Sequence, residues 1–119
     1  MSKHYIDTVE KYLSALSNQT RTAIPEIFAP NATVEDPVGT PAHEGIDAIV
    51  AFYEGAFSAG VTGELTGQVR VAGKSAAFPF IVKVGPSMQI NVIDIFEFND
   101  EGKVVSMKAY WGPENIQNL

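Results

Sequence analysis

Hydrophobic residues in the first half of the chain recur at helical spacing. From residue 5 to residue 18 they fall three and four apart, which predicts an amphipathic helix that stops near Asn18. Its apolar stripe comprises Ile6, Val9, Leu13 and Leu16, flanked by Tyr5 and Tyr12. A second, short helix is expected over residues 22–28, where Pro25 is tolerated because it lies in the first turn. A third is expected over residues 45–57, with Ile46, Ile49, Val50 and Tyr53 on its buried side.

In the second half the hydrophobic period changes to two, which is typical of strands. Strands are expected over residues 65–71, 78–84, 90–98 and 103–111, with turn residues between the last two. Helices followed by a meander of strands indicate an α+β fold, with three N-terminal helices packed on one face of a curved, mostly antiparallel sheet. The strand near Ile90 is apolar on both faces, so its second face is expected to be covered by another subunit.

Composition narrows the class of protein. The 119 residues, 45% of them hydrophobic, predict one domain spanning residues 1–119 with a sizeable core. A net charge of −6 argues against nucleic acid and anionic membranes as partners. There is no cysteine, and no apolar stretch approaches the roughly 18 residues of a membrane span. Because the N-terminus lacks a signal-peptide core as well, a cytoplasmic protein is expected.

Asp94 is the most informative single position. On a strand it shares one face with four apolar side chains, which are Ile90, Val92, Phe96 and Phe98. An ionised carboxylate is costly to bury there, so the carboxyl either keeps its proton and donates a hydrogen bond, or pairs with a structural partner. The sequence pattern alone supports these two interpretations equally.

Two further polar residues lie in apolar surroundings. Asp36 precedes Pro37, stays extended for that reason, and sits between an extended segment and a loop. A carboxylate there could act as a general base, although a turn-forming role is favoured from the pattern alone. Tyr12 lies on the stripe of the first helix, where a buried phenol needs a hydrogen-bond partner.

Other chemistries find no support in the sequence. His4 and His43 are the only histidines, and no cluster has metal-ligand spacing. Phosphate-binding glycine loops and nucleophile elbows are absent, so we expect neither metal nor cofactor. Most of the aromatic residues are expected in the core, because aromatic side chains are usually buried. They are also numerous enough to line an apolar pocket. They include Phe28, Phe52, Tyr53, Phe57, Phe78, Phe80 and Trp111.

Several blocks, in the same order and at similar spacing, resemble the bacterial ketosteroid isomerases, or steroid Δ-isomerases. They are residues 11–16, 32–39, 51–53, 92–98 and 102–111. The resemblance covers residues 5–111, is weakest over 56–63, and is specific because three separate functional positions match together. It implies the cone-shaped, barrel-like α+β fold that this family shares with nuclear-transport-factor-two-like proteins, and homodimers formed through the sheets.

The resemblance also implies roles for individual residues. Asp36 resembles the general base, Tyr12 and Asp94 the two donors to a dienolate oxygen, and Tyr53 the residue that bonds Tyr12. Ketosteroid isomerases are a known example of a carboxylic acid kept protonated by an apolar site. Positions matching the steroid pocket are Leu16, Phe52, Phe80, Ile90, Val92, Met107, Ala109 and Trp111. Phe28 stands where some relatives have a further tyrosine.

The sequence therefore predicts a cofactor-independent isomerase of 3-oxo-Δ5 steroids. Two alternatives stay open, because fold does not determine function. One is another enzyme of the same fold that acts on a different enolisable ketone, such as a polyketide cyclase. The other is a non-catalytic domain that binds a small ligand. The set formed by Tyr12, Asp36 and Asp94 discriminates between them, because a binding module would need none of the three.

Overall fold

The computed structural model describes residues 2–119, beginning with helix α1 (Ser2–Asn18). Its buried side carries the stripe expected from the sequence, including Val9, Leu13 and Leu16. The helix ends in a left-handed residue, Gln19 (φ 56°), and the amide of Thr20 donates to the carbonyl of Ala15. This is the hydrogen bond with which a Schellman motif closes a helix.

The second helical segment covers residues 21–27, close to the predicted range, but only its second half is α-helix. It consists of a 3₁₀ turn, η1 (Arg21–Ala23), followed by a single turn of helix, α2 (Ile24–Ile27). Strand β1 (Phe28–Glu35) begins at once, so Phe28 belongs to this strand and not to the predicted helix. Pro30 is accommodated because the register between β1 and its neighbour β7 shifts between Phe28 and Thr33, and proline in a sheet is confined to such irregularities or to edges.

Helix α3 (Ile46–Ser58) agrees with the prediction for residues 45–57. It follows the two-residue strand β2 (His43–Glu44), and the turn between them requires Gly45, whose φ of 86° is one that other residues rarely adopt. Ile49, Tyr53 and Phe57 form its buried side. The α3 helix therefore directs Tyr53 toward α1 and the sheet.

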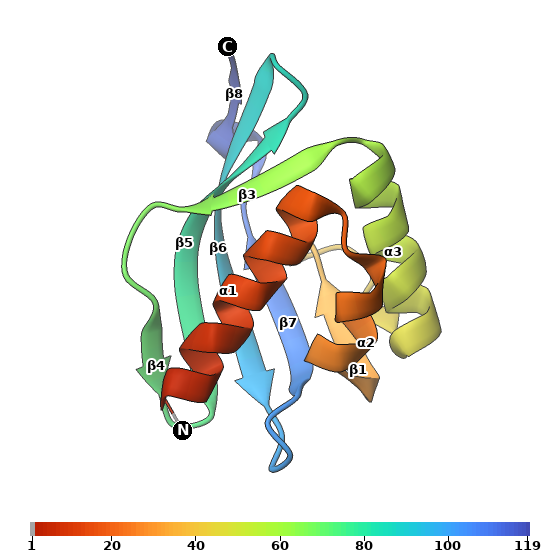
Figure 1. Cartoon of the computed structure of the whole chain (residues 1–119). Helices are drawn as coiled ribbons and strands as arrows, with labels where there is room; N and C mark the ends of the chain where they lie inside the picture. Colours follow the sequence, from red (N-terminus) through yellow and green to blue (C-terminus); the bar gives the residue numbers. More distant parts are fainter. Residues whose placement is uncertain (1) are drawn as a thin grey trace.

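The sheet contains eight strands in the order β2-β1-β7-β6-β5-β3, with β4 paired to β5 and β8 paired to β6. Its long strands are β5 (Ser75–Val84), β6 (Met88–Phe98) and β7 (Val104–Tyr110). Only β1 and β7 run parallel among the paired strands of residues 2–119. The helices cover one face of this curved sheet, as Figure 1 shows, so the predicted α+β fold is confirmed.

The prediction of one strand over residues 65–71 is wrong. The chain forms two strands there, β3 (Val61–Leu65) and β4 (Arg70–Ala72), both paired with β5. The break lies opposite Pro79 of β5, which has no amide hydrogen to donate. Gly67 fits this break because a Cβ there would lie 3.0 Å from the Pro79 ring.

The end of the chain holds an element that the sequence did not predict. After β7, a 3₁₀ turn, η2 (Pro113–Asn115), leads into strand β8 (Ile116–Asn118). Strand β8 pairs with the beginning of β6, where Ile116 lies opposite Ile90. Residues 111–115 are thus not part of β7, and Trp111 lies just beyond that strand.

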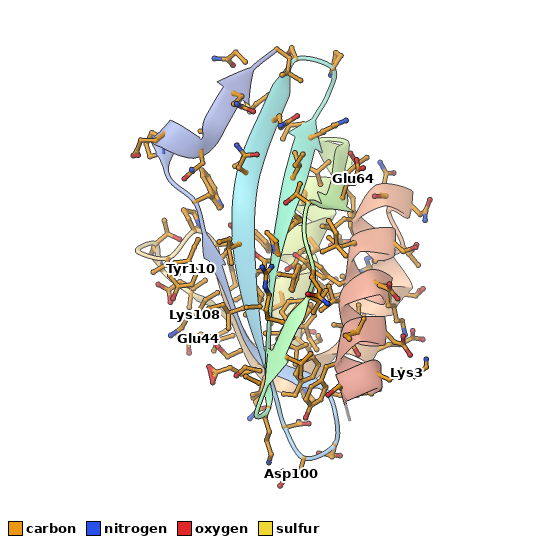
Figure 2. The ribbon with its side chains drawn as sticks, turned by 90° about the vertical axis from the view of Figure 1, so that its left-hand side faces the viewer. Lys3, Glu44, Glu64, Asp100, Lys108 and Tyr110 are labelled. Atoms are coloured by element: carbon orange, nitrogen blue, oxygen red, sulfur yellow. The ribbon has the colours of Figure 1, made fainter. Side chains whose placement is uncertain are left out.

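The two faces of the sheet differ in composition. The inner face, with α1 and α3, encloses a hydrophobic core that includes Phe78, Phe96 and Met107. The outer face, directed away from the helices in Figure 2, exposes two large apolar side chains, Ile93 (49%) and Tyr110 (45%). Within residues 2–119, no helix has the length and apolar character needed to cross a membrane.

Candidate active site

A cavity of about 140 Å³ opens between α1, α3 and the inner face of the sheet. Most of its wall is aliphatic or aromatic, and its polar groups are two carboxyls, two phenols and one indole. The lining residues are Tyr12, Leu16, Asp36, Phe52, Tyr53, Ala56, Val61, Phe80, Val82, Val84, Ile90, Val92, Asp94 and Trp111.

Asp36 occupies the position where β1 gives way to a loop, and it is partly buried. The indole Nε1 of Trp111 donates a hydrogen bond to Asp36 Oδ1 at 2.8 Å. Burial raises the pKa of the Asp36 carboxyl, while the Trp111 hydrogen bond and the charge of His43 lower it. The result is a carboxylate that is held in one orientation at the cavity wall and that is more basic than a free aspartate.

Asp94 lies on the inner row of β6 and is almost completely buried, with 1% of its surface exposed. Neither of its carboxyl oxygens has a hydrogen-bond partner among residues 2–119. Burial raises the pKa of Asp94 well above its ordinary value, and the charge of Asp36 raises it further. Burial therefore favours the neutral form of this acid, and both carboxyl oxygens keep their hydrogen-bonding capacity for a ligand in the cavity.

Tyr12 and Tyr53 form a hydrogen-bonded pair between α1 and α3. Their hydroxyl oxygens lie 2.9 Å apart and both side chains are buried. Burial raises the pKa of each phenol well above its ordinary value, so both keep their protons. Phe28 packs against both rings, with centroids 6.3 Å from Tyr12 and 5.8 Å from Tyr53, but it adds no hydroxyl to the pair.

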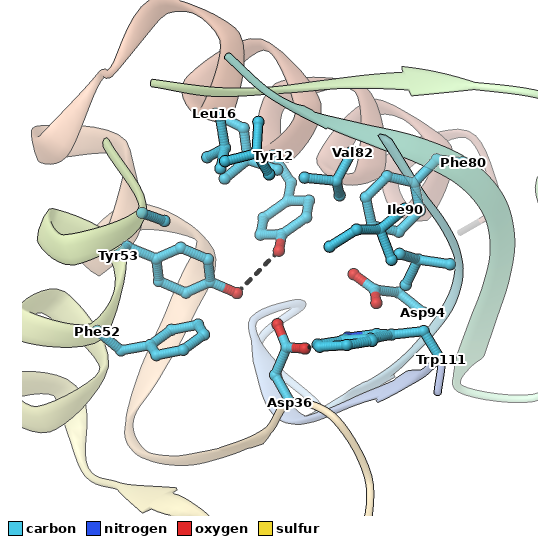
Figure 3. Close-up of a pocket in the computed structure, with 14 residues that line it drawn as sticks. Tyr12, Leu16, Asp36, Phe52, Tyr53, Phe80, Val82, Ile90, Asp94 and Trp111 are labelled. Atoms are coloured by element: carbon cyan, nitrogen blue, oxygen red, sulfur yellow. Dashed lines mark hydrogen bonds between the residues drawn. The ribbon is translucent and has the colours of Figure 1, made fainter. Parts of the chain in front are cut away.

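Figure 3 shows how these groups face one another. The Tyr12 hydroxyl and the Asp94 carboxyl point into the same space from α1 and from β6, while Asp36 approaches it beside the Trp111 ring. One ionisable carboxylate thus faces two groups that hold protons. This arrangement can remove a proton from a bound molecule and stabilise the negative charge that develops on a nearby oxygen.

Most of the residues selected from the sequence meet in this cavity. Tyr12, Asp36, Tyr53 and Asp94 line it, together with Leu16, Phe52, Phe80, Ile90, Val92 and Trp111. Met107 and Ala109 are not among the lining residues, so their contact with the substrate stays a prediction. Both are 1% exposed and face the core from β7, where Ala109 lies opposite Asp94 in the neighbouring strand.

Four lining residues were missed from the sequence. Val82 and Val84 continue the alternation of β5 beyond Phe80, so the period of two could have found them. Ala56 lies four residues after Phe52, which places it on the same side of α3. Val61 begins β3 and carries no such signal, because its placement depends on the turn that follows α3.

The described part of the chain contains no group of three or more histidine, cysteine, aspartate or glutamate side chains that could hold a metal ion.

Comparisons with known proteins show which family the chain resembles. A family model for the SnoaL-like domain matches residues 9–107. The chain is 38% identical over 119 residues to a steroid Delta-isomerase of Nocardioides simplex, covering 98% of this chain and 96% of that protein. It also resembles a solved structure, with 31% identity and a TM-score of 0.92 over 99% of this chain and 98% of the other. The protein in that structure is the epoxide hydrolase/cyclase-like enzyme SalBIII, which has a role in pyran ring formation in polyether salinomycin. The chain therefore belongs to the SnoaL-like family of nuclear-transport-factor-two-like domains and, within it, to the steroid Δ-isomerases.

Proposed function

We propose that this isomerase moves the double bond of 3-oxo-Δ5 steroids into conjugation with the ketone, giving 3-oxo-Δ4 products. The observation that carries the proposal is the unequal environment of two carboxyls in one apolar cavity. Asp36 accepts a hydrogen bond from Trp111, whereas Asp94 is buried with no partner among residues 2–119. This difference in environment supports the role of base for Asp36 and the role of acid for Asp94.

In the proposed reaction, the Asp36 carboxylate removes a proton from the carbon between the 3-oxo group and the 5,6 double bond. The electrons of that C–H bond move onto the ketone oxygen, which becomes a dienolate. The protonated Asp36 then returns the proton two carbons along the steroid, and the carbonyl re-forms. The proton never leaves Asp36 for water, so the step needs no other reactant.

Tyr12 and Asp94 are the proposed donors to the dienolate oxygen. Each has a proton to give, and the apolar cavity strengthens both hydrogen bonds because it excludes water. One preorganised donor of this kind is typically worth about 10²–10³ in rate, and a positioned general base about 10²–10⁴. Tyr53 supports the first donor through its 2.9 Å hydrogen bond to Tyr12.

The test is ultraviolet absorbance after purified protein is added to a β,γ-unsaturated 3-oxosteroid. Conjugation of the product ketone raises the absorbance without a coupling enzyme. We expect a fast rise with the native protein and nearly none with Asp36→Asn, which keeps the size of the side chain but is no base. Turnover retained in Asp36→Asn would refute the assigned role, and no turnover in the native protein would refute the substrate.

A second candidate function is a ring-closing reaction on another enolisable ketone. It is favoured by the similarity to a cyclase-like enzyme at 31% identity and a TM-score of 0.92. The same base and acids could serve such a reaction. A protein that binds an equilenin-like phenol weakly and does not isomerise the steroid would favour this candidate, because a cavity complementary to a dienolate should bind that phenol tightly. Tight phenol binding without turnover would instead indicate a non-catalytic binding domain.

We also infer that the protein is a homodimer formed through the outer face of its sheet. Ile93 and Tyr110, the two large exposed apolar side chains of that face, are register partners on β6 and β7. They border a shallow hollow whose other outward-facing residues are Thr66, Pro79, Asn91 and Asn115. A second copy of the chain would cover this apolar surface. Light scattering coupled to gel filtration would give the mass of a dimer, and the mass of a monomer would refute the inference.

A further inference from the structure

His43 lies next to the cavity without lining it. It forms the two-residue strand β2 with Glu44, and it is the register partner of Val34, which precedes Asp36 by two residues. The side chain is partly buried. Its ring makes no hydrogen bond or ion pair within residues 2–119, so neither kind of contact explains its position.

The contact that His43 does make is with the wall of the site. Its ring centroid lies 4.5 Å from that of Phe52, with 33° between the ring planes. Phe52 lines the cavity and packs edge to face on Tyr53 at 5.0 Å. His43 therefore supports, from outside the cavity, the aromatic wall that faces Asp36.

The charges around Asp36 indicate a second role for His43, which is electrostatic. The fourteen residues that line the cavity include no lysine, arginine or histidine, so the candidate base has no cation inside the site. The positive charge of His43 is close enough to favour the ionised form of the Asp36 carboxyl and to lower its pKa. Asp94, Tyr12 and Tyr53 face Asp36 from the other elements, and Asp36 raises the pKa of each.

Other charged side chains lie on the elements packed around His43. They are Glu35 on β1, Glu44 on β2, Asp47 at the start of α3 and Lys108 on β7 opposite Glu35. The Glu35 carboxylate accepts a hydrogen bond from the amide of Gly39, which holds it within its own loop. These groups are unchanged when His43 is replaced, so a substitution at His43 isolates its own contribution.

We propose that His43 is a positioning residue for this site: its ring supports Phe52, and its positive charge, held beside β1 by the pairing of β2, helps Asp36 to act as a base. The catalytic consequence rests on the proposed isomerase function. The positive charge of His43 favours the ionised form of Asp36 and should therefore extend turnover toward lower pH.

Two substitutions separate the ring from the charge. His43→Phe keeps an aromatic ring against Phe52 and removes the charge, whereas His43→Arg supplies a permanent charge on a planar group that can still stack. Asp36 is observed directly by ¹³C NMR of carboxyl-labelled protein, with its signal assigned by its absence in Asp36→Asn. We expect Asp36 to titrate at higher pH in His43→Phe than in the native protein, and not in His43→Arg.

The same variants are compared in turnover through the ratio of kcat/KM at pH 5 to that at pH 8. Relative to the native protein, His43→Phe should lower this ratio by roughly two- to fivefold, less than a contact ion pair would give, because the charge is partly exposed. His43→Arg should restore it. High salt should reduce the difference. His4→Gln, which replaces the other histidine at the far end of α1, should leave the ratio as in the native protein.

The outcomes are distinguishable. An Asp36 titration that is the same in the native protein and in folded His43→Phe overturns the inference about His43, whatever the turnover. An Asp36 titration that shifts as expected, in a protein that turns over no steroid, upholds the role of His43 and overturns the proposed substrate. Circular dichroism confirms that each variant is folded before it is compared.

Discussion

The buried carboxyl of Asp94 should make the protein less stable as the pH rises. Asp94 is 1% exposed, has no partner among residues 2–119, and has a pKa raised well above its ordinary value by burial. In the unfolded chain an aspartate ionises near pH 3.9. Between that pH and the pKa of the folded state, the unfolded chain binds fewer protons than the folded one, so the free energy of unfolding falls as pH rises.

The magnitude of this effect follows from proton linkage. One proton of difference between the two states lowers the free energy of unfolding by about 1.4 kcal/mol for each pH unit of this window. Asp94→Asn has nearly the same size and cannot ionise in either state. We therefore expect it to gain stability over the native protein by that amount per unit above about pH 4, and to show a constant difference below it. The raised pKa of Asp36 also lowers the free energy of unfolding as pH rises, but it does so in both proteins, so its effect cancels in the difference between them.

The assay is urea unfolding of both proteins at half-unit steps from pH 3 to pH 8, with the difference in free energy plotted against pH. Asp47→Asn, an exposed residue in the first turn of α3, corrects for the loss of one negative charge. A difference that does not change between pH 4 and pH 8 would show that Asp94 ionises in the folded protein. The role of Asp94 as a proton donor would then be refuted.

Three further predictions concern single side chains. Trp111→Phe removes the indole N–H that lowers the pKa of the candidate base, so the acid limb of kcat/KM should move to higher pH; a pH profile that does not move contradicts this. Gly63→Val places a Cβ 3.0 Å from a methyl group of Leu13 and should cost about 1–3 kcal/mol in urea unfolding. The matched change Gly55→Ala, where a Cβ meets nothing within 4 Å on α3, should stabilise the helix by about 0.5–1 kcal/mol, and equal effects at the two glycines would refute the packing argument. Ile93→Glu should turn the expected dimer into a monomer in light scattering, and an unchanged mass would exclude β6 from the interface.

The features that the sequence predicted well depend on local patterns. The stripe of α1 and the inner row of β6 follow from spacing, and this spacing places Tyr12 and Asp94 correctly on their elements. For Asp94 the pattern left a protonated donor and a structural pair equally open. The structure excludes the pair within residues 2–119, because both carboxyl oxygens lack partners.

The features that the sequence did not predict depend on contacts between distant residues. The hydrogen bond from Trp111 to Asp36 joins residues 75 positions apart, so no local sequence pattern predicts it. The break between β3 and β4 depends on Pro79 in a strand opposite. Strand β8 forms only because β6 extends beyond the end of β7 and offers an unpaired edge.

This division of β6 between two neighbours has a consequence for how the site opens. Strand β7 accompanies residues 93–98, including Asp94, and the three-residue β8 accompanies residues 88–90, including the cavity residue Ile90. Short terminal strands open at little cost in free energy, whereas long central ones open only with the whole domain. Amide hydrogens at residues 88–90 should therefore exchange with solvent faster than those at residues 93–98. The two ends of β6 therefore differ in how readily they open, and Asp94 lies on the end that β7 holds.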